Sequence, residues 1–326
     1  MSEVLATGRG AAQAHPLAVL IPTWSTRFLA DTLASLAAQT DQRFTVYVGD
    51  DASPDDVRSL CSGFTDRLDL RYQRFASNLG GHDLVAQWTR CVQWTSEPWV
   101  WMIGDDDMLE PGCVAAFHAA RRQHPGVTLF HFSVRRIDAA GKLLENEAVF
   151  PPVLSARQFL LGRLTFSLAS YAPDYVFRRQ TFDERGGFQR FPLAWCSDDA
   201  TWATLAAPAG IRSVPGPRVC WRLSGSNISA RSAANANAKI EAHLQFVEWL
   251  VVALPDMAQQ AGEPDDATLK RWAAYWFFEQ AERVGCRFRP GLAWRAARRL
   301  ARSGVCSVPV ALARSVRVNW HLARAG

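Results

Sequence analysis

Apolar runs that suit buried strands alternate with helical patterns over the first hundred residues. The strand-like runs fall at 17–24, 44–50, 68–75 and 99–104. Between them, at 26–40, 57–68 and 83–95, apolar side chains recur every three to four residues, which is the spacing of one helix face. Regular alternation of strand and helix is typical of a parallel, doubly wound α/β sheet.

The pattern changes after about residue 125. We expect a hairpin at 127–144 with its turn at 139–142, then helix, loop and strand at 155–182, a helix near 198–206 and a strand at 218–223. From Asn235 onward the pattern is helical, with breaks at Pro255, Pro264, Pro290 and Pro309. These patterns predict a flexible N-terminus at 1–15, an α/β domain at 16–230 with halves at 16–125 and 126–230, and a helical C-terminal extension at 231–326.

Three of the predicted strands end on residues that suit ligand binding. Pro22 and Thr23 end the first strand, Asp50 and Asp51 follow the second, and the acids Asp105–Asp107 follow the fourth. In doubly wound sheets, ligands bind at the carboxyl ends of the strands. Adjacent carboxylates repel one another, so three in a row indicate a bound divalent cation. The alternative is an acidic surface turn without a ligand.

Other nucleotide-binding signatures are missing from the sequence. No GxGxxG follows the first strand and no GxxxxGK[ST] occurs anywhere, which argues against dinucleotide and P-loop enzymes. The seven cysteines include no CxxC pair, so reduced thiols are expected rather than a zinc site. Because the sequence shows neither an apolar leader nor an apolar stretch of bilayer length, it predicts a cytoplasmic protein.

Basic residues gather at the C-terminal end of the chain. From Arg283 onward there are ten arginines and no acid, whereas the rest of the chain has 26 basic and 31 acidic residues. Helical spacing puts Arg295, Arg298, Arg299 and Arg302 on one stripe. A basic helix of this kind favours a membrane surface, here the inner face of the plasma membrane. The alternative is a solvated arginine-rich face packed on the main domain. Nucleic acid is not expected, because no recognition fold accompanies the arginines.

Five stretches, in order, resemble the family-two glycosyltransferases of the GT-A fold. They are VLIPTWSTRFLADTLASLAAQT, FTVYVGDDASPDD, NLGGHDLVAQWTRCV, WVWMIGDDDMLEP, and SDDATWATLA with CWRLSGSNIS. The resemblance covers about residues 16–230 and leaves the C-terminal extension outside. It implies a GT-A-like, mostly parallel sheet and an enzyme that uses a nucleoside-diphosphate sugar, by preference a UDP-sugar, with Mn²⁺ or Mg²⁺.

The resemblance also implies which residues hold the donor. The nucleotide contacts would be Pro22, Thr23, Asp50, Asp51, Asn78, Gly80 and Asp105. An aspartate there can accept the imide N–H of uracil; the alternative for Asp51 is a turn cap. The metal would bind Asp106 with help from Asp107. Arg222 would clamp the diphosphate, or else be a surface arginine on an edge strand. Two departures are visible, since Gly104 replaces the first acid of many relatives and Ser224 replaces a frequent histidine.

For the transfer itself, the resemblance implies an inverting single displacement with a carboxylate as general base. Asp198 is the first candidate and Asp199 the second; the alternative is that both compensate the charge of a helix N-terminus. Trp195 would stack on an acceptor sugar. The acceptor would be a glycan or a lipid-linked glycan. The rival functions are a nucleotidyltransferase and a non-catalytic nucleotide-sugar-binding or assembly protein.

Overall fold

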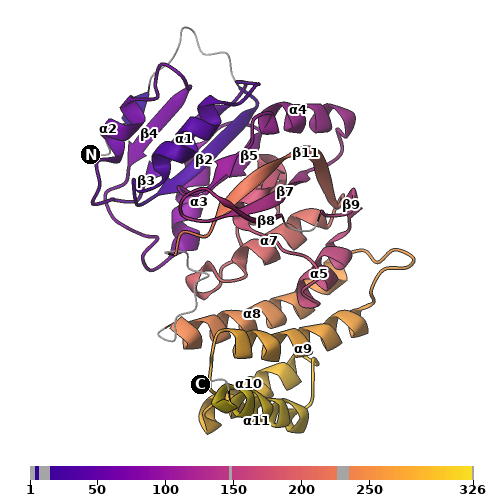
Figure 1. Cartoon of the computed structure of the whole chain (residues 1–326). Coiled ribbons are helices and arrows are strands. Elements are labelled where there is room, and N and C mark those ends of the chain that lie inside the picture. The colour runs from indigo at the N-terminus through magenta and orange to yellow at the C-terminus, as the bar shows by residue number, and fades with distance from the viewer. Residues whose placement is uncertain (1–3, 7–14, 147–148, 226–234, 325–326) are drawn as a thin grey trace. The chain divides into compact units, whose positions relative to one another are not determined.

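The chain forms two compact units in a computed structural model that describes residues 4–6, 15–146, 149–225 and 235–324 (Figure 1). Unit 1 comprises Met1–Leu154, Ser170–Phe188 and Ala209–Asn227. Unit 2 comprises Ser155–Ala169, Gln189–Pro208 and Ile228–Gly326. This division differs from the consecutive domains at 16–230 and 231–326 that the sequence predicts. Two segments that precede residue 230, Ser155–Ala169 and Gln189–Pro208, cluster with the C-terminal helices.

The centre of unit 1 is a parallel sheet of four strands. These are β2 (Leu17–Thr23), β3 (Thr45–Asp50), β4 (Leu70–Arg74) and β5 (Trp99–Met102), in the order β4-β3-β2-β5. All the neighbouring pairs among them are parallel. Because β2 lies between β3 and β5, the chain winds first to one side and then to the other. This confirms the doubly wound fold that the sequence predicts.

The rest of the sheet is mixed. It adds β1 (Val4–Ala6), β6 (Met108–Leu109), β7 (Leu129–Ile137), β8 (Leu143–Asn146), β9 (Val153–Leu154), β10 (Tyr175–Arg178) and β11 (Ile211–Arg222). These strands pair antiparallel, except that β7 and β11 run parallel. The predicted hairpin is present as β7 and β8. Of the N-terminus expected to be flexible, residues 1–3 and 7–14 lie outside the described part, and β1 pairs with β4.

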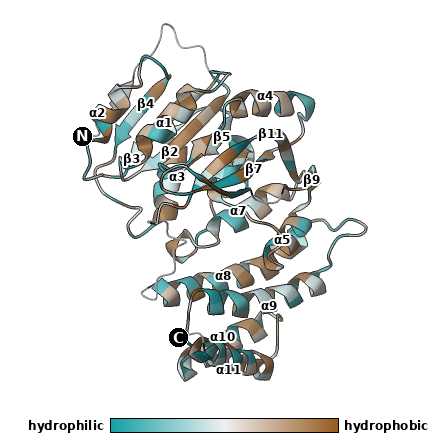
Figure 2. Ribbon diagram, viewed as in Figure 1, coloured by the Kyte–Doolittle hydropathy of each residue, from teal (hydrophilic) through white to brown (hydrophobic). Residues whose placement is uncertain are grey.

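Burial of apolar side chains on both faces explains the parallel strands. Residues 17–21 of β2 are fully buried, as are Val100 and Trp101 of β5, and hydrophobic residues run along both strands in Figure 2. The helices of unit 1 are α1 (Leu29–Ala37), α2 (Val57–Ser62), α3 (Leu84–Trp94), α4 (Cys113–Gln123), η1 (Ala172–Asp174) and α6 (Arg179–Glu184). Leu29, Leu33 and Leu36 of α1 are fully buried in the core of the sheet, as helical spacing predicts.

Unit 2 is helical. It contains α5 (Ala156–Leu164), η2 (Pro192–Ala194), α7 (Ser197–Ala206), α8 (Ala236–Ala253), η4 (Leu254–Asp256), α9 (Asp266–Arg283), α10 (Pro290–Arg302) and α11 (Val308–Arg324). Pro290 is the first residue of α10 and Pro309 the second of α11, where a missing N–H costs no hydrogen bond. None of the helices described is long and apolar enough to cross a membrane.

Hydrogen bonds of a buried arginine join segments of unit 2 that are far apart in the sequence. The Arg157 side chain on α5 is almost fully buried. Its guanidinium donates to the carbonyl oxygens of Met257 at 2.8 Å and Leu254 at 3.2 Å, and to the Asp266 carboxylate at 2.8 Å. Because all these partners lie about a hundred residues later, Arg157 joins α5 to the segment between α8 and α9 and to the start of α9.

Candidate functional site

The loop after β2 presents an exposed tryptophan on a fixed backbone. The N–H groups of Trp24 and Ser25 donate to Asp105 Oδ2 at 3.1 and 3.2 Å, and the Trp24 carbonyl accepts from Ser53 Oγ at 2.6 Å. The Trp24 side chain is nevertheless 55% exposed. Three strand ends, those of β2, β3 and β5, are thus joined through the main chain of one residue whose ring faces solvent.

Asp50, predicted to contact the nucleotide, is fully buried at the end of β3. Its Oδ2 accepts from the Tyr72 hydroxyl at 2.6 Å and from Arg74 Nη1 at 2.8 Å, and its Oδ1 accepts from the Ser53 N–H at 2.7 Å. Both carboxylate oxygens are therefore occupied within unit 1. Through these bonds, Asp50 joins β3 to β4 and to the turn at Ser53.

Asp51 organises the loop that contains Asn78 and Gly80. Its carboxylate accepts from the N–H groups of Leu79 and Gly80, each at 2.7 Å, and also from the Arg90 guanidinium. A Cβ at Gly80 would lie 2.7 Å from Asp51 Oδ2, so only glycine lets this loop approach the carboxylate. The Asn78 amide donates to the Asp51 carbonyl at 3.1 Å. Three of the predicted nucleotide contacts therefore form one connected turn.

The three consecutive acids differ in their surroundings. Asp105 binds the Trp24 loop, and its burial raises its pKa to about 6. Asp107 is buried, and its two oxygens accept from the N–H groups of Arg222 and Gly104, both at 3.1 Å. Burial and the adjacent Asp106 charge raise the pKa of Asp107 to about 8. Asp106 is partly buried, which raises its pKa, and it interacts with Ser224 and Arg222.

Gly104 explains how three acids fit into this turn. A Cβ at this position would lie 2.7 Å from Asp107 Oδ2 and 2.9 Å from Asp106 Oδ1. The absence of a side chain lets both carboxylates fold back over residue 104. The departure seen in the sequence therefore has a steric reason, because an acid at 104 would occupy the space that the carboxylates of Asp106 and Asp107 take.

Arg222, predicted to clamp a diphosphate, is buried with a side chain only 1% exposed. Its Nε donates to the Asp106 carbonyl at 2.8 Å, Nη1 to the Ala139 carbonyl at 3.0 Å and Nη2 to Asp31 Oδ2 at 3.0 Å. The guanidinium also lies over the Phe28 ring. All three guanidinium nitrogens thus have partners inside unit 1, and Arg222 is not the surface arginine that the alternative supposed.

The described residues contain no group of three or more His, Cys, Asp or Glu side chains placed to hold a metal. Asp107 is a poor ligand here, because main-chain N–H groups occupy both its oxygens. Carboxylate oxygen is nonetheless the donor that Mg²⁺ prefers, and Mg²⁺ at nucleotide sites takes one or two carboxylates together with phosphate oxygens. Asp106, with Asp105 beside it, fits a metal site of this kind, in which the protein supplies only one or two ligands.

In unit 2, Asp198 and Asp199 open helix α7, as predicted. Asp199 is buried and paired in a two-point contact with Arg163, Nε to Oδ1 and Nη2 to Oδ2, both at 2.9 Å. Asp198 is partly exposed. Burial, followed by the charge of Asp199, raises the pKa of Asp198 to about 7. The two acids thus differ, since Asp199 forms an ion pair with Arg163 and Asp198 has a raised pKa.

The segment before α7 is strained. Leu193, Ala194 and Cys196 have φ values of 60°, 54° and 65°, in the left-handed region that non-glycine residues avoid. Trp195, in their midst, donates from Nε1 to His243 Nε2 at 2.6 Å, and the buried Lys239 ammonium lies 4.2 Å from its ring centroid. Side chains of α8 therefore hold the ring of Trp195, which is partly buried.

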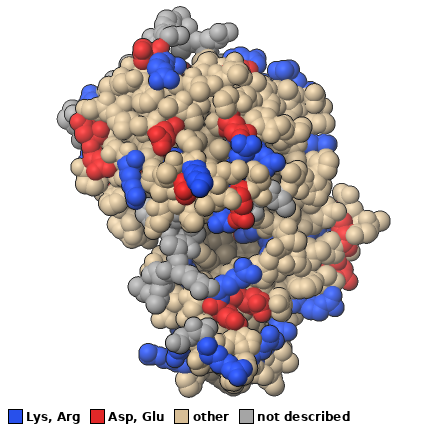
Figure 3. Space-filling view, viewed as in Figure 1, with Lys and Arg blue, Asp and Glu red and all other residues tan. Residues whose placement is uncertain are grey.

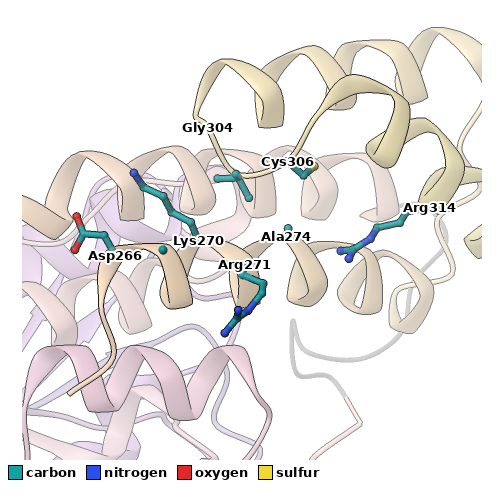
Figure 4. A pocket seen from close by; sticks show the side chains of 9 residues that line it. Asp266, Lys270, Arg271, Ala274, Gly304, Cys306 and Arg314 are labelled. Carbon is teal, nitrogen blue, oxygen red and sulfur yellow. The ribbon is translucent and has the colours of Figure 1, made fainter. Parts of the chain in front are cut away.

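A separate pocket of about 460 Å³ lies in unit 2 among α9, α11 and the turn before α11. Figure 4 shows Asp266, Lys270 and Arg271 on α9 and Arg314 on α11 around it. None of the residues predicted from the sequence lines this pocket. It is basic in character, since Asp266 is already paired with Arg157.

Trp24 is not among the residues predicted from the sequence. Its signal was present, because an aromatic residue directly follows Pro22-Thr23 at the end of the first strand. The exposure of its ring could not be derived from the pattern, in which a large apolar side chain after a buried strand looks like a continuation of the core.

Comparison with known proteins supports the resemblance. Residues 18–152 match the model of glycosyl transferase family 2. No curated protein matches the chain in sequence. Among solved structures, S. aureus TarS 1–349 in complex with UDP-GlcNAc has a TM-score of 0.66 at 12% identity, with 94% of this chain and 90% of that chain covered. The same protein in complex with UDP gives 0.63 at 14% identity, with 94% and 89% covered. The fold class is thereby confirmed.

Proposed function

We propose, on the premise that residues 18–152 are a glycosyl transferase family 2 region of GT-A fold, that the protein transfers a sugar from a nucleoside-diphosphate sugar, with UDP as the preferred nucleotide. The acceptor would be a glycan or a lipid-linked glycan. The observation that carries this proposal is Trp24, whose exposed ring stands on a main chain fixed by Asp105 and Ser53 at the carboxyl end of β2.

Trp24 is suited to hold the base of the donor. Aromatic rings stack on nucleobases, and each stacked base contributes roughly 1–3 kcal/mol. A ring whose backbone is already ordered loses little further freedom when it binds. The structures of S. aureus TarS with UDP-GlcNAc and with UDP support a uridine nucleotide as the first candidate. In this proposal Asp50 and Asp51 support the donor site by shaping the turns around it.

A divalent cation, Mn²⁺ or Mg²⁺, would neutralise charge that builds on the departing diphosphate. Asp106 would hold it, with Asp105 assisting. Asp107, which accepts from the N–H groups of Gly104 and Arg222, and Arg222, whose Nε donates to the Asp106 carbonyl, would keep Asp106 in place.

Asp198 would serve as the general base of an inverting transfer. The acceptor oxygen forms a bond to the anomeric carbon, the bond from that carbon to the phosphate oxygen breaks, and the nucleoside diphosphate leaves with the electron pair. The acceptor proton passes to Asp198, whose raised pKa suits a proton acceptor near neutral pH. The bidentate pair with Arg163 holds the neighbouring Asp199 in place at the start of α7.

The proposal is tested by calorimetric titration of the chain with UDP and GDP, each with Mn²⁺ and with EDTA. We expect binding of UDP that needs the metal, a loss of about tenfold or more in Trp24→Ala, and loss of the metal dependence in Asp106→Asn. Tyr275→Ala, which removes an exposed aromatic ring from unit 2, serves as the control and should bind UDP normally.

Two outcomes would contradict this function. No binding of UDP or GDP, with or without metal, would leave the acids with a structural role only, as acceptors of main-chain N–H groups. Metal-dependent UDP binding without release of UDP from any UDP-sugar and acceptor would favour a non-catalytic nucleotide-sugar-binding protein.

A further inference from the structure

The last two helices of unit 2 expose tryptophan and arginine side chains together. On α10, Trp294 is 52% exposed, and Arg295, Arg298 and Arg302 are exposed near it. Residues 294 and 298 are one turn apart, so the ring and the guanidinium lie on the same face. This face contains no acid.

Helix α11 repeats the arrangement. Val316 and Trp320 are 68% and 54% exposed, and Arg317 and Arg324 are exposed on the same stripe at spacings of three and four residues. The Arg324 guanidinium lies 4.1 Å from the Trp320 ring centroid. We call the exposed residues of both helices the Trp/Arg surface; they are Trp294, Arg295, Arg298, Arg302, Val316, Arg317, Trp320 and Arg324.

The arginines of this surface are not tied up in ion pairs within the described part of the protein, although Arg295 lies close enough to Glu241 of α8 to lower the pKa of that carboxyl. None of its five arginines forms an ion pair within the residues that the structure describes. Arg299, which the sequence places on the same stripe, is different: it binds Glu241 and Glu248 of α8 at 2.6 Å each. The structure therefore divides the predicted stripe, with one arginine stabilising the fold and the others exposed. Blue basic side chains are visible over the C-terminal helices in Figure 3.

We propose that the Trp/Arg surface binds the interfacial region of an anionic phospholipid bilayer. Tryptophan rings are enriched where headgroups meet acyl chains, and arginines close by attract anionic lipids. Charge complementarity selects this partner, because a second copy of the chain would place one basic face against another. The inference goes beyond the proposed sugar transfer and does not depend on it.

Neighbouring basic side chains reinforce the attraction. Lys270, Arg271 and Arg314 line the pocket among α9, α11 and the turn before α11 (Figure 4). Asp266, the acid that lines it, is held by Arg157 at 2.8 Å. The net positive charge of unit 2 near its C-terminus thus extends past the exposed helices.

The test is co-sedimentation of the full chain with vesicles of phosphatidylglycerol and phosphatidylcholine, and with vesicles of phosphatidylcholine alone. We expect binding only to the anionic vesicles and weaker binding when salt is raised from about 0.1 M to about 1 M, which shortens the Debye length from about 10 to about 3 Å. The variant with Arg295→Ser, Arg298→Ser and Arg302→Ser should bind about 100-fold more weakly.

A matched variant controls for charge. Arg58→Ser, Arg67→Ser and Arg122→Ser together remove three exposed arginines from unit 1, and binding should stay close to that of the native chain. The pair Trp294→Ser and Trp320→Ser should reduce binding even at low salt. Circular dichroism confirms that each variant is folded.

Three results would overturn the inference. They are absence of binding to any vesicle, equal binding to anionic and neutral vesicles, and equal loss in the two triple arginine variants. Binding of a single-stranded oligonucleotide without binding of vesicles would assign the surface to nucleic acid and also overturn it. Calorimetric titration with UDP on the same samples shows separately whether the donor site is intact.

Discussion

Gly104 shows how one missing side chain shapes the acidic turn. In Gly104→Ala the new Cβ would meet the carboxylates of Asp106 and Asp107 at 2.9 and 2.7 Å. We expect the free energy of unfolding to fall by about 1–3 kcal/mol, as for other overpacked sites, together with a loss of UDP affinity. Gly126→Ala is the control in denaturant titrations, because nothing lies within 4 Å of its Cβ position. Equal stability of both variants would refute the steric explanation.

The protonation of Asp198 sets a pH dependence for transfer. A general base works only when deprotonated, and burial and the Asp199 charge raise the pKa of Asp198 to about 7. Activity should therefore rise as pH increases through about 7 and be lost at lower pH. Asp198→Asn should reduce the rate by about 10²–10⁴-fold while UDP binding persists.

Asp199→Asn distinguishes the two acids of α7. It removes a negative charge beside Asp198 and leaves the Arg163 guanidinium without its carboxylate partner. Both changes favour the charged form of Asp198, so the midpoint of the pH–rate profile should move to lower pH. A midpoint that does not move in Asp199→Asn, or a profile that is flat between pH 6 and 8 in the native enzyme (about one unit on either side of the expected pKa), would show that Asp198 is not the base.

Hydrogen bonds between elements decide what Arg222 does. If its guanidinium joins β11 to the acidic turn, α1 and the 138–139 turn, as its contacts indicate, Arg222→Met should lower the free energy of unfolding by about 2–4 kcal/mol. Arg135→Met, which breaks the partly exposed pair of β7 with Glu110, should cost at most about 1 kcal/mol. A clamp for diphosphate would instead leave Arg222→Met as stable as the native chain and weaken only UDP binding.

The elements that the sequence predicts well are those with a complete hydrophobic pattern. The strands β2, β3 and β5 follow apolar runs, and α1 and α3 follow helical spacing. Strands β6 and β9 have two residues each, which is too short for any period to appear. They form because β11 offers the edge that β7 leaves free, and β9 and β6 pair with its two ends. A hydrophobic pattern reflects neighbours along the chain, so it does not reveal pairings between strands distant in sequence.

The sequence predicts which residues form the candidate site better than it predicts the hydrogen-bond and ion-pair partners of those residues. The acids at the strand ends were found because strand ends are where a doubly wound sheet binds ligands. Their partners were not, since Asp107 and Arg222, whose N–H it accepts, lie 115 residues apart in sequence. The same holds for Asp199, whose charge is neutralised by an arginine 36 residues earlier. Burial and pairing across the chain decide which acids remain accessible.

For the whole molecule, the two compact units predict the result of truncation. A chain ending at residue 230 would retain α5 and α7 but lose the partners of Arg157 and Trp195, which lie on α8, α9 and the turns between them. We expect residues 155–169 and 189–208 of that fragment to be cut rapidly by protease, whereas the full chain resists. A fragment that resists cleavage there would show that 16–230 folds by itself.

The interleaving of the units has a consequence during synthesis. Helices α5 and α7 leave the ribosome long before α9 and α8, the later helices they pack with. At about 5–20 residues per second, the remaining hundred or so residues take on the order of ten seconds to appear. Throughout that interval the apolar side chains of Trp202, Phe159 and Leu160, all fully buried in the finished protein, lack their final neighbours. We therefore expect a nascent chain with this order of helices to bind chaperones that shield apolar segments, and to stay bound longer when translation is slower.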